Sequence, residues 1–443
     1  WDKEQNSLIS LQEINILNSL SQNNDKSLIT KEASRIKIIF ITNKVINYTS
    51  VFRDRIGIIY NLDRRYFDVY IGLFTNVNNP NHKQNILSKI RNVNVISNYL
   101  DYFIKSDKIL YLDNTYLQYN QSLLERKEFH IIFYPDIGMM QSQTLLAHSR
   151  LAPIQCVTWG HSDTSGLSRE VIDYYITSQY FENMDNTEII KENYTEKPIL
   201  LPSLGTFYYS PRKIVDNYFK PSFEQFALNK EQMGFPKNSL IIGCLQSFYK
   251  FNEDFEHTIR MILDRCAHIP DLKDNVYLAM CNSFPFNKLH LARLEKYLGK
   301  YKLQIKWFQN LAPPEWLNLI SICHIMIDPF PFGGCNTTLE AFDYGIPVVC
   351  KPSNVINGRF SLGFIKRISE EVNDEQGLIE KCLVANSNEE YVNLVVRLLQ
   401  DKTRYNYIFN MILEGKKGLF EEGESLRDYQ KMFIDLVKKH LLS

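Results

Sequence analysis

A glycine-rich turn between two apolar segments constrains this chain more than any other feature. Residues 325–350 have the sequence IMIDPFPFGGCNTTLEAFDYGIPVVC, in which a short apolar run is followed by prolines, by Gly333 and Gly334, and by a helix-compatible segment. Gly345 suits a helix C-terminus, and residues 346–350 are apolar enough for a buried strand. The pattern predicts a βαβ unit. Its loop would present backbone N–H groups and the positive end of a helix dipole to an anion.

The residues after the two glycines can bind a nucleotide. Asn336, Thr337 and Thr338 stand at the expected helix start, and Glu340 lies in its first turn. There a carboxylate can accept hydrogen bonds from a ribose diol while the loop binds phosphate. A purely structural interpretation stays open, in which Thr337 or Thr338 caps the helix and Glu340 completes a capping arrangement.

Size and composition limit the classes of protein. A chain of 443 residues exceeds the usual size of one core, so we expect two or more domains. Lysine plus arginine equals aspartate plus glutamate, 50 each, which argues against a general nucleic-acid binder. No long uncharged apolar run predicts a membrane span. The eight cysteines form no C-x-x-C pair, so the reducing cytoplasm, or a host cell's cytosol, fits best.

Strand and helix patterns alternate along most of the chain. Residues 1–33 form a polar, helix-compatible segment and linker, and the start at Trp1 makes an upstream domain in a longer chain possible. We expect a doubly wound domain at 34–225, a second at 226–415, and a last helix at 416–443 that packs back on the first domain. The expected strands of the first domain are residues 36–41, 68–74, 94–96, 130–134, 154–159, 174–177 and 198–201.

The second alternating series follows a polar, proline-bearing connector at 209–236. Two Rossmann-like α/β domains with parallel sheets, facing each other across a cleft, are the fold class that the two series predict. The expected strands are residues 240–245, 276–280, 305–308, 325–327 and 346–350, and the expected helices are residues 255–269, 288–298, 314–322, 391–400 and 425–441.

Several segments resemble O-GlcNAc transferase and its relatives, in the same order along the chain. LAPIQCVTWGHSDTSG at 151–166 is similar to that family's R-P-A-P-I-Q and W-L-G-Y-P-G-T-S-G, and DYYITS at 173–178 continues it. FYK at 248–250 stands where the family has its donor-phosphate lysine, and NTT at 336–338 resembles its H-T-T. PFPFG at 329–333 resembles the related cytosolic bacterial N-glucosyltransferases. The resemblance extends from about residue 35 to the C-terminus.

The resemblance implies a GT-B fold and an enzyme. Its members transfer a sugar with inversion from a UDP-sugar, here GlcNAc or glucose, to a protein Ser/Thr hydroxyl or Asn amide. They need no metal and no cofactor, because a lysine and helix N-termini neutralise the departing diphosphate. Two alternatives stay open: a non-catalytic GT-B-like binding module, and a GT-B enzyme that acts on a glycan or small molecule.

Catalytic roles are expected for three residues, two of them placed by the resemblance and the third, Asp136, by its position at the end of a strand. Lys250 would hold the β-phosphate of the leaving UDP, although a solvated surface lysine is the structural alternative. His161 and Asp136 are candidate general bases at the ends of first-domain strands. A loop histidine can also be only a hydrogen-bonding partner, and Asp136 can form an Asx turn before Gly138.

Donor binding would involve a larger set. Residues 308–313 would bind uracil through backbone groups with Trp316 against the ring, although Trp316 is equally compatible with a core position. Arg359 would support the diphosphate or form a surface salt bridge. The expected donor-binding residues are Tyr249, Gln309, Leu311, Ala312, Trp316, Gly333, Gly334, Asn336, Thr337, Thr338, Glu340 and Arg359.

The chain departs from O-GlcNAc transferase at several of these positions. Pro314 and Leu317 stand where that family has a lysine and a histidine after its A-P, and residues 43–50 lack its catalytically important histidine. Asn336 replaces the histidine of H-T-T, and Glu340 replaces an aspartate. These departures concern the sugar and the acceptor more than UDP.

Overall fold

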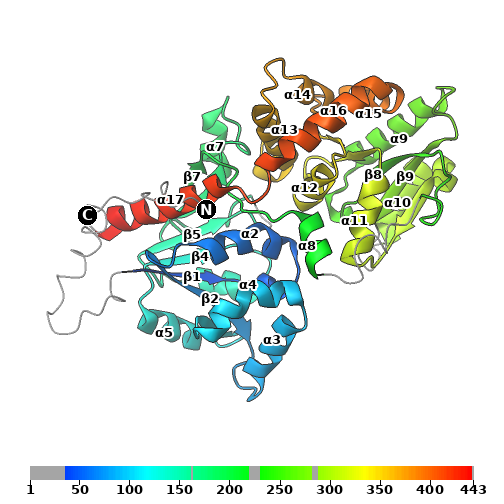
Figure 1. Ribbon diagram of the computed structural model, residues 1–443. Helices are drawn as coiled ribbons and strands as arrows, with labels where there is room; N and C mark the ends of the chain where they lie inside the picture. The colour runs from blue at the N-terminus through cyan, green and yellow to red at the C-terminus, as the bar shows by residue number, and fades with distance from the viewer. Residues whose placement is uncertain (1–34, 161–162, 219–229, 282–287, 442–443) are drawn as a thin grey trace, which may run out of the picture. The chain divides into compact units, whose positions relative to one another are not determined.

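The computed structural model describes residues 35–160, 163–218, 230–281 and 288–441. The chain separates into two compact units (Figure 1). The first consists of the described residues of Trp1–Ser178, Asn186–Phe207 and Glu422–Ser443, and the second of those of Gln179–Asp185 and Tyr208–Glu421. The expected N-terminal segment 1–33 lies outside the described residues, as does the expected domain boundary at residues 225 and 226, which stays a prediction.

The first unit contains a seven-stranded sheet, and all of its pairings are parallel. The strand order is β3-β2-β1-β4-β5-β6-β7. Most of its residues are isoleucine, valine, leucine or aromatic, and they are buried because helices cover both faces of a doubly wound sheet. The strands are β1 (Ile36–Ile41), β2 (Phe67–Thr75), β3 (Ile109–Asp113), β4 (Ile131–Tyr134), β5 (Ile154–Thr158), β6 (Tyr174–Ser178) and β7 (Lys197–Leu201).

The last helix of the chain completes the core of this unit. Helix α17 (Gly423–Leu441) packs against α2, β5 and β7 and is drawn in red in Figure 1. Its Phe433 ring lies 6.1 Å from that of Phe67 and 6.0 Å from that of Phe133. The other helices are α2 (Ser50–Asn61), α3 (His82–Arg91), α4 (Asn94–Lys105), α5 (Leu117–Lys127), α6 (Gln141–Ala147) and α7 (Thr187–Asn193).

The strand expected at residues 94–96 is wrong. The segment lies in helix α4, whose buried residues Val95, Ile96, Tyr99, Leu100 and Phe103 recur at helical spacing. A three-residue apolar run fits either a strand or a helix, and the residues that follow it decide. The third strand is instead β3, which pairs with β2.

The second unit contains a five-stranded parallel sheet in the order β10-β9-β8-β11-β12. The strand order reverses next to β8, which is the arrangement of a Rossmann-like unit, so both predicted units are confirmed as parallel α/β structures. The strands are β8 (Leu240–Cys244), β9 (Val276–Cys281), β10 (Ile305–Phe308), β11 (Ile325–Ile327) and β12 (Val348–Val349).

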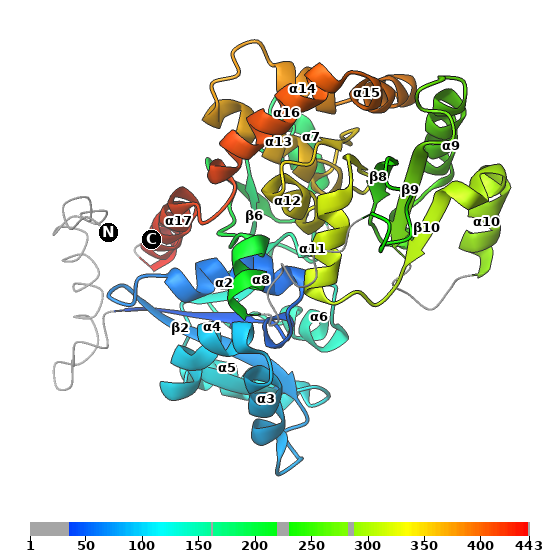
Figure 2. The same cartoon turned by 45° about the vertical axis from the view of Figure 1, so that its right-hand side comes forward.

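The C-terminal part of this unit is helical, as predicted. Figure 2 shows α13, α14, α15 and α16 side by side, and α15 also packs on α9. No helix of the described residues is long and apolar enough to cross a membrane. The helices are α8 (Pro211–Tyr218), α9 (Glu253–Ala267), α10 (Lys288–Leu298), α11 (Pro313–Ile322), α12 (Asn336–Asp343), α13 (Phe360–Glu371), α14 (Leu378–Leu383), α15 (Asn388–Gln400) and α16 (Lys402–Gly415).

The expected connector at 209–236 is not entirely a loop. It contains helix α8, which packs against α11 and α12. Just before α8 the buried Ser210 donates from Oγ to Asp343 Oδ2 at 2.7 Å. This polar segment therefore contains a helix that is held in place by side-chain hydrogen bonds as well as by packing of its apolar residues. Residues 219–229 lie outside the described part of this segment.

Candidate functional site

The predicted βαβ unit is present, and its loop is closely packed. Strand β11 ends at Ile327, α12 begins at Asn336, and Gly345 has a φ of +78° just after the helix. A Cβ atom at Gly333 would lie 2.6 Å from Asp328 Oδ2, and one at Gly334 would lie 2.5 Å from Gln246 Nε2. An added methyl group at either position would therefore displace Asp328 Oδ2 or Gln246 Nε2 from its hydrogen-bond partners.

Asp328 holds this loop through hydrogen bonds. It is 3% exposed; its Oδ1 accepts a hydrogen bond from the Gly334 N–H, and its Oδ2 accepts one from Ser361 Oγ at 2.7 Å. The Ser361 hydroxyl also shares a hydrogen bond with Thr338 Oγ1 at 2.9 Å. Burial raises the pKa of Asp328 to about 6, opposed by the hydrogen bond from Ser361 and by the positive charge of Lys250.

Lys250 reaches the same loop from the neighbouring strand. It ends a 3₁₀ turn, η5 (Phe248–Lys250), that follows β8, and its Nζ donates to Gly333 O at 2.6 Å and to Gln246 Oε1 at 2.9 Å. The Nζ atom also lies 4.6 Å from the centre of the Phe332 ring. Burial lowers the pKa of Lys250, and the charge of Asp328 opposes that shift. The ammonium group is thus held on the glycine loop rather than free in solvent.

Thr337 and Asn336 begin the helix. Thr337 Oγ1 accepts a hydrogen bond from Gln246 Nε2, and Asn336 Oδ1 accepts one from the Tyr208 hydroxyl at 2.5 Å. The residue that caps α12 is Cys335, whose side chain makes no capping hydrogen bond in the described structure. The alternative in which Thr337 or Thr338 only caps the helix is therefore wrong. Their side chains point to other elements of the unit.

Glu340 and Trp316 contact each other. The Trp316 indole N–H donates to Glu340 Oε2 at 2.8 Å, and Glu340 is 2% exposed. The bond joins helix α11 to the first turns of α12. Trp316 is neither fully buried nor fully exposed, so a place against a uracil ring stays a prediction.

The expected uracil segment lies where β10 ends. Gln309 and Ala312 are exposed and Leu311 is half-buried, just ahead of α11. The backbone N–H of Ala312 donates to Glu315 Oε2 at 2.8 Å, which fixes the start of that helix. The carboxyl ends of parallel strands meet at one edge of a sheet, so this segment shares an edge with Lys250 and the glycine loop.

Two other residues that were predicted to bind the UDP-sugar donor differ in their surroundings. Tyr249 is 55% exposed, and its ring centre lies 6.0 Å from that of Phe332. Arg359 is buried, and its guanidinium donates to the carbonyls of Phe181 at 3.0 Å, Ser353 at 3.1 Å and Glu182 at 3.2 Å. Arg359 therefore forms no surface salt bridge of the expected kind. It ties the segment Gln179–Asp185 to the second unit, and a direct contact with diphosphate stays a prediction.

The candidate bases belong to the first unit. Asp136 is fully buried two residues after β4, and its Oδ1 accepts a hydrogen bond from Gln143 Nε2 at 2.7 Å. Its Oδ2 has no hydrogen-bond partner among the described residues. Burial raises the pKa of Asp136 to about 6, against the effect of the bond from Gln143. His161 lies outside the described residues.

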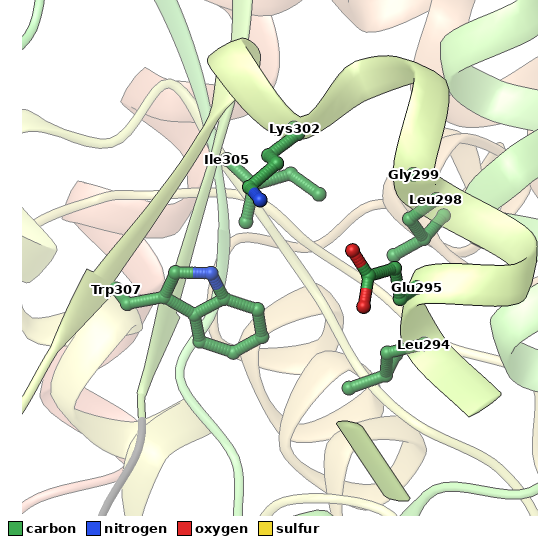
Figure 3. Close-up of a pocket in the computed structure, with 7 residues that line it drawn as sticks. All are labelled: Leu294, Glu295, Leu298, Gly299, Lys302, Ile305 and Trp307. Atoms are coloured by element: carbon green, nitrogen blue, oxygen red, sulfur yellow. The ribbon is translucent and has the colours of Figure 1, made fainter. Parts of the chain in front are cut away.

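A cavity of about 210 Å3 lies elsewhere in the second unit (Figure 3). The Trp307 indole of β10 stands on one side, and Leu294 and Glu295 of α10 stand on the other. None of its lining residues is a predicted site residue. They are Leu294, Glu295, Leu298, Gly299, Lys302, Ile305 and Trp307.

Comparison with known proteins finds curated relatives but no family profile. No known family profile matches the sequence. A curated relative, the UDP-glucose:protein N-beta-glucosyltransferase of Actinobacillus pleuropneumoniae serotype 5b, is 24% identical over 286 residues, 64% of this chain and 40% of that protein. The probable UDP-N-acetylglucosamine–peptide N-acetylglucosaminyltransferase SPINDLY of Petunia hybrida is 26% identical over 263 residues, 57% of this chain and 24% of that protein. The chain is thus similar, over part of its length, to these two glycosyltransferases. It matches less than half the length of these curated relatives.

Solved structures place the fold within the GT-B class, as predicted. A mutant O-GlcNAc transferase of Thermobaculum terrenum superimposes with a TM-score of 0.67 at 14% identity, covering 97% of this chain and 78% of the other. Anabaena HepE in complex with UDP and glucose superimposes with a TM-score of 0.54 at 12% identity, covering 91% of this chain and all of the other. At these identities the likeness shows the fold alone.

Three residues of this candidate site escaped the sequence analysis. Gln246, Asp328 and Ser361 hold the glycine loop, yet none belongs to a motif by itself. The position of Asp328 directly after a buried strand and ahead of the glycines was a usable signal, because polar residues at that edge point toward the loop. Gln246 and Ser361 lie 91 and 23 residues from their threonine partners, so no local pattern marks them.

Proposed function

We propose that this chain binds a UDP-sugar at the glycine loop of its second unit and transfers glucose or GlcNAc to a protein acceptor. The observation that carries the proposal is the Lys250 ammonium group, held 2.6 Å from Gly333 O at the start of α12. A cation and a helix N-terminus at one loop favour a diphosphate. The printed names of the curated relatives, a UDP-glucose:protein N-beta-glucosyltransferase and a probable N-acetylglucosaminyltransferase, support the donor and acceptor classes.

In this mechanism the acceptor's nucleophile attacks the anomeric carbon from the side opposite UDP. The bond from that carbon to the β-phosphate oxygen breaks, and its electron pair stays on the phosphate, so the configuration inverts. Lys250 and the N–H groups at the start of α12 stabilise the charge that develops there, which replaces a divalent metal ion. The acceptor's proton passes to a base. Asp136 is our candidate because burial raises its pKa to about 6, and His161 stays a second candidate.

Within the second unit we assign the ribose to Glu340 and the uracil to the backbone around Leu311 and Ala312. Glu340 is buried two residues beyond Thr338, and Trp316 holds one of its oxygens. The segment before α11 lies at the same edge of the sheet as the glycine loop. We also propose a reducing, cytoplasmic location, because none of the eight cysteines forms a disulfide and seven of them are buried.

The proposal is tested by measuring UDP release from UDP-glucose and UDP-GlcNAc with a protein acceptor mixture, with and without EDTA. We expect release that EDTA does not slow, accompanied by entry of labelled sugar into polypeptide. Lys250→Ala should reduce release by roughly a hundredfold or more, since it removes the charge that faces the leaving group. Lys273→Ala, at an exposed lysine of the same unit, is the control and should keep full activity.

The possible outcomes separate the alternatives. Tight UDP binding with no turnover of either donor would support a non-catalytic binding module. Turnover with label only in glycans or small molecules would show that the acceptor is a glycan or a small molecule rather than a protein. Full activity in Lys250→Ala would contradict the phosphate assignment.

A further inference from the structure

Gln246 connects the two groups of the second unit that face the proposed diphosphate. It follows β8 by two residues and is 6% exposed. Its Oε1 accepts a hydrogen bond from Lys250 Nζ at 2.9 Å, and its Nε2 donates one to Thr337 Oγ1. One buried amide thus joins the lysine after β8 to the helix start after β11.

The chemistry of the three groups determines the direction of these bonds. An ammonium group can only donate, so it selects the amide oxygen of Gln246. The amide nitrogen, which also can only donate, must then face Thr337. Thr337 Oγ1 therefore uses a lone pair toward Gln246, and its single proton points to a different acceptor.

Thr337 is half-exposed and belongs to the first turn of α12, where the helix dipole and the Lys250 charge favour an anion. An anionic oxygen is an acceptor without a proton, so it complements a hydroxyl whose proton is still available. Gly334 preserves the arrangement, because a Cβ there would lie 2.6 Å from Thr337 Oγ1 as well as 2.5 Å from Gln246 Nε2.

We infer that Gln246 is a positioning residue that turns the Thr337 hydroxyl proton toward the diphosphate of the donor while it holds Lys250 in place. The inference rests on the proposed function. Gln246 acts through two other side chains, so its effect should appear in the recognition of phosphate and not in that of the nucleoside.

The test compares UDP with uridine as calorimetric ligands of the whole 443-residue chain. In Gln246→Glu the new carboxylate pairs with Lys250 and accepts the Thr337 proton, which reverses the direction of that bond. We expect UDP affinity to fall by at least about tenfold, as for loss of a charge-assisted hydrogen bond, and uridine affinity to change less than about twofold. Gln376→Glu, at an exposed glutamine of the same unit, controls for the added charge and should bind UDP as the parent chain does.

A second pair of variants keeps the inference testable if Gln246→Glu does not fold. Thr337→Val lacks the hydroxyl and should lose UDP affinity selectively, whereas Thr337→Ser should keep it. An unchanged ratio of UDP to uridine affinity in both Gln246→Glu and Thr337→Val would overturn the inference. Failure of the parent chain to bind UDP at all would instead overturn the proposed function.

Discussion

Asp328 and Asp136 are both buried aspartates that follow a strand of a parallel sheet, yet their partners differ. Asp328 lies directly after β11 and accepts hydrogen bonds at both oxygens, from Gly334 N and Ser361 Oγ. Asp136 lies just beyond β4; hydrogen bonds from Gln143 and Thr42 oppose the effect of burial on its pKa, while its Oδ2 has no partner within hydrogen-bonding geometry in the described chain. Burial raises the pKa of both to about 6.

This difference is our reason for assigning Asp328 a structural role and for proposing Asp136 as the general base. Both oxygens of Asp328 accept hydrogen bonds that hold the glycine loop, so its charge positions other groups. Asp136 keeps one oxygen that can take up a proton, which is what a general base needs. Similar burial thus leads to different expected roles, and the partners decide which role applies.

Replacing each aspartate with asparagine should give the largest difference between the two sites in stability and in transfer activity. Asp328→Asn can keep its oxygen toward the Gly334 N–H, but its NH2 then faces Ser361 Oγ, which must change from donor to acceptor, and the buried negative charge near Lys250 is lost. We expect the free energy of unfolding to fall by about 1–3 kcal/mol. Asp136→Asn keeps the acceptor for Gln143, so its stability at pH 7 should be unchanged or higher, but transfer should fall. Urea denaturation and UDP-release assays check both, and equal destabilisation by the two exchanges would contradict the comparison.

The glycine loop around Asp328 should tolerate no side chain. Gly334→Ala would crowd Gln246 and Thr337, and we expect UDP affinity to fall by roughly tenfold, a cost of about 1.4 kcal/mol. Gly299→Ala is the matched control, since its Cβ would meet only Glu295 Cγ at 3.7 Å and should change nothing. Calorimetry with UDP measures the effect. Normal affinity in Gly334→Ala would show that the loop is less closely packed than described.

The pH dependence of stability should isolate Asp136. Its pKa of about 6 lies above the ordinary value, so the folded chain holds this proton between about pH 4 and pH 6 whereas the unfolded chain has released it. The contribution of Asp136 to stability therefore falls as pH rises through that window. Buried Asp328, whose pKa is also raised to about 6, contributes in the same direction, and buried His324, with a pKa lowered to about 4, contributes in the opposite direction.

The other titrating groups are the same in Asp136→Asn and in the parent chain, so their contributions cancel when the free energies of unfolding of the two proteins are subtracted. We expect the variant to gain stability relative to the parent by about 1–2 kcal/mol between pH 4 and pH 7. Urea denaturation across this range provides the measurement. A constant difference would mean that Asp136 titrates as an ordinary aspartate.

The smallest expected effect concerns a third buried carboxylate, Glu340. Trp316→Phe removes the indole N–H that Glu340 Oε2 accepts at 2.8 Å but keeps an aromatic ring. If the indole acts by orienting Glu340, uridine affinity should fall about two- to fivefold, as for one hydrogen bond. Unchanged affinity would support stacking against uracil, because phenylalanine can still stack.

Local patterns predicted most of the fold. The strands at β1 and β8 were visible because parallel strands buried on both faces are largely apolar runs. The expected helix at 288–298 agrees with α10 (Lys288–Leu298). The prediction of a strand at 94–96 was wrong because three apolar residues are too few to distinguish the helical from the strand period. Helix α8 was not predicted because it lies in a polar segment.

The sequence alone determined the glycine loop of the second unit, the order of its strands and helices, and the residue types able to meet a diphosphate. These follow from local chemistry, since glycine permits a close turn and parallel strands send their loops to one edge. Only the tertiary structure decided that Lys250 lies on Gly333, that Gln246 joins Lys250 to Thr337, and that Arg359 holds backbone carbonyls. Such contacts join atoms far apart in the chain, and the packing of whole elements, rather than any neighbouring residue, sets their distances.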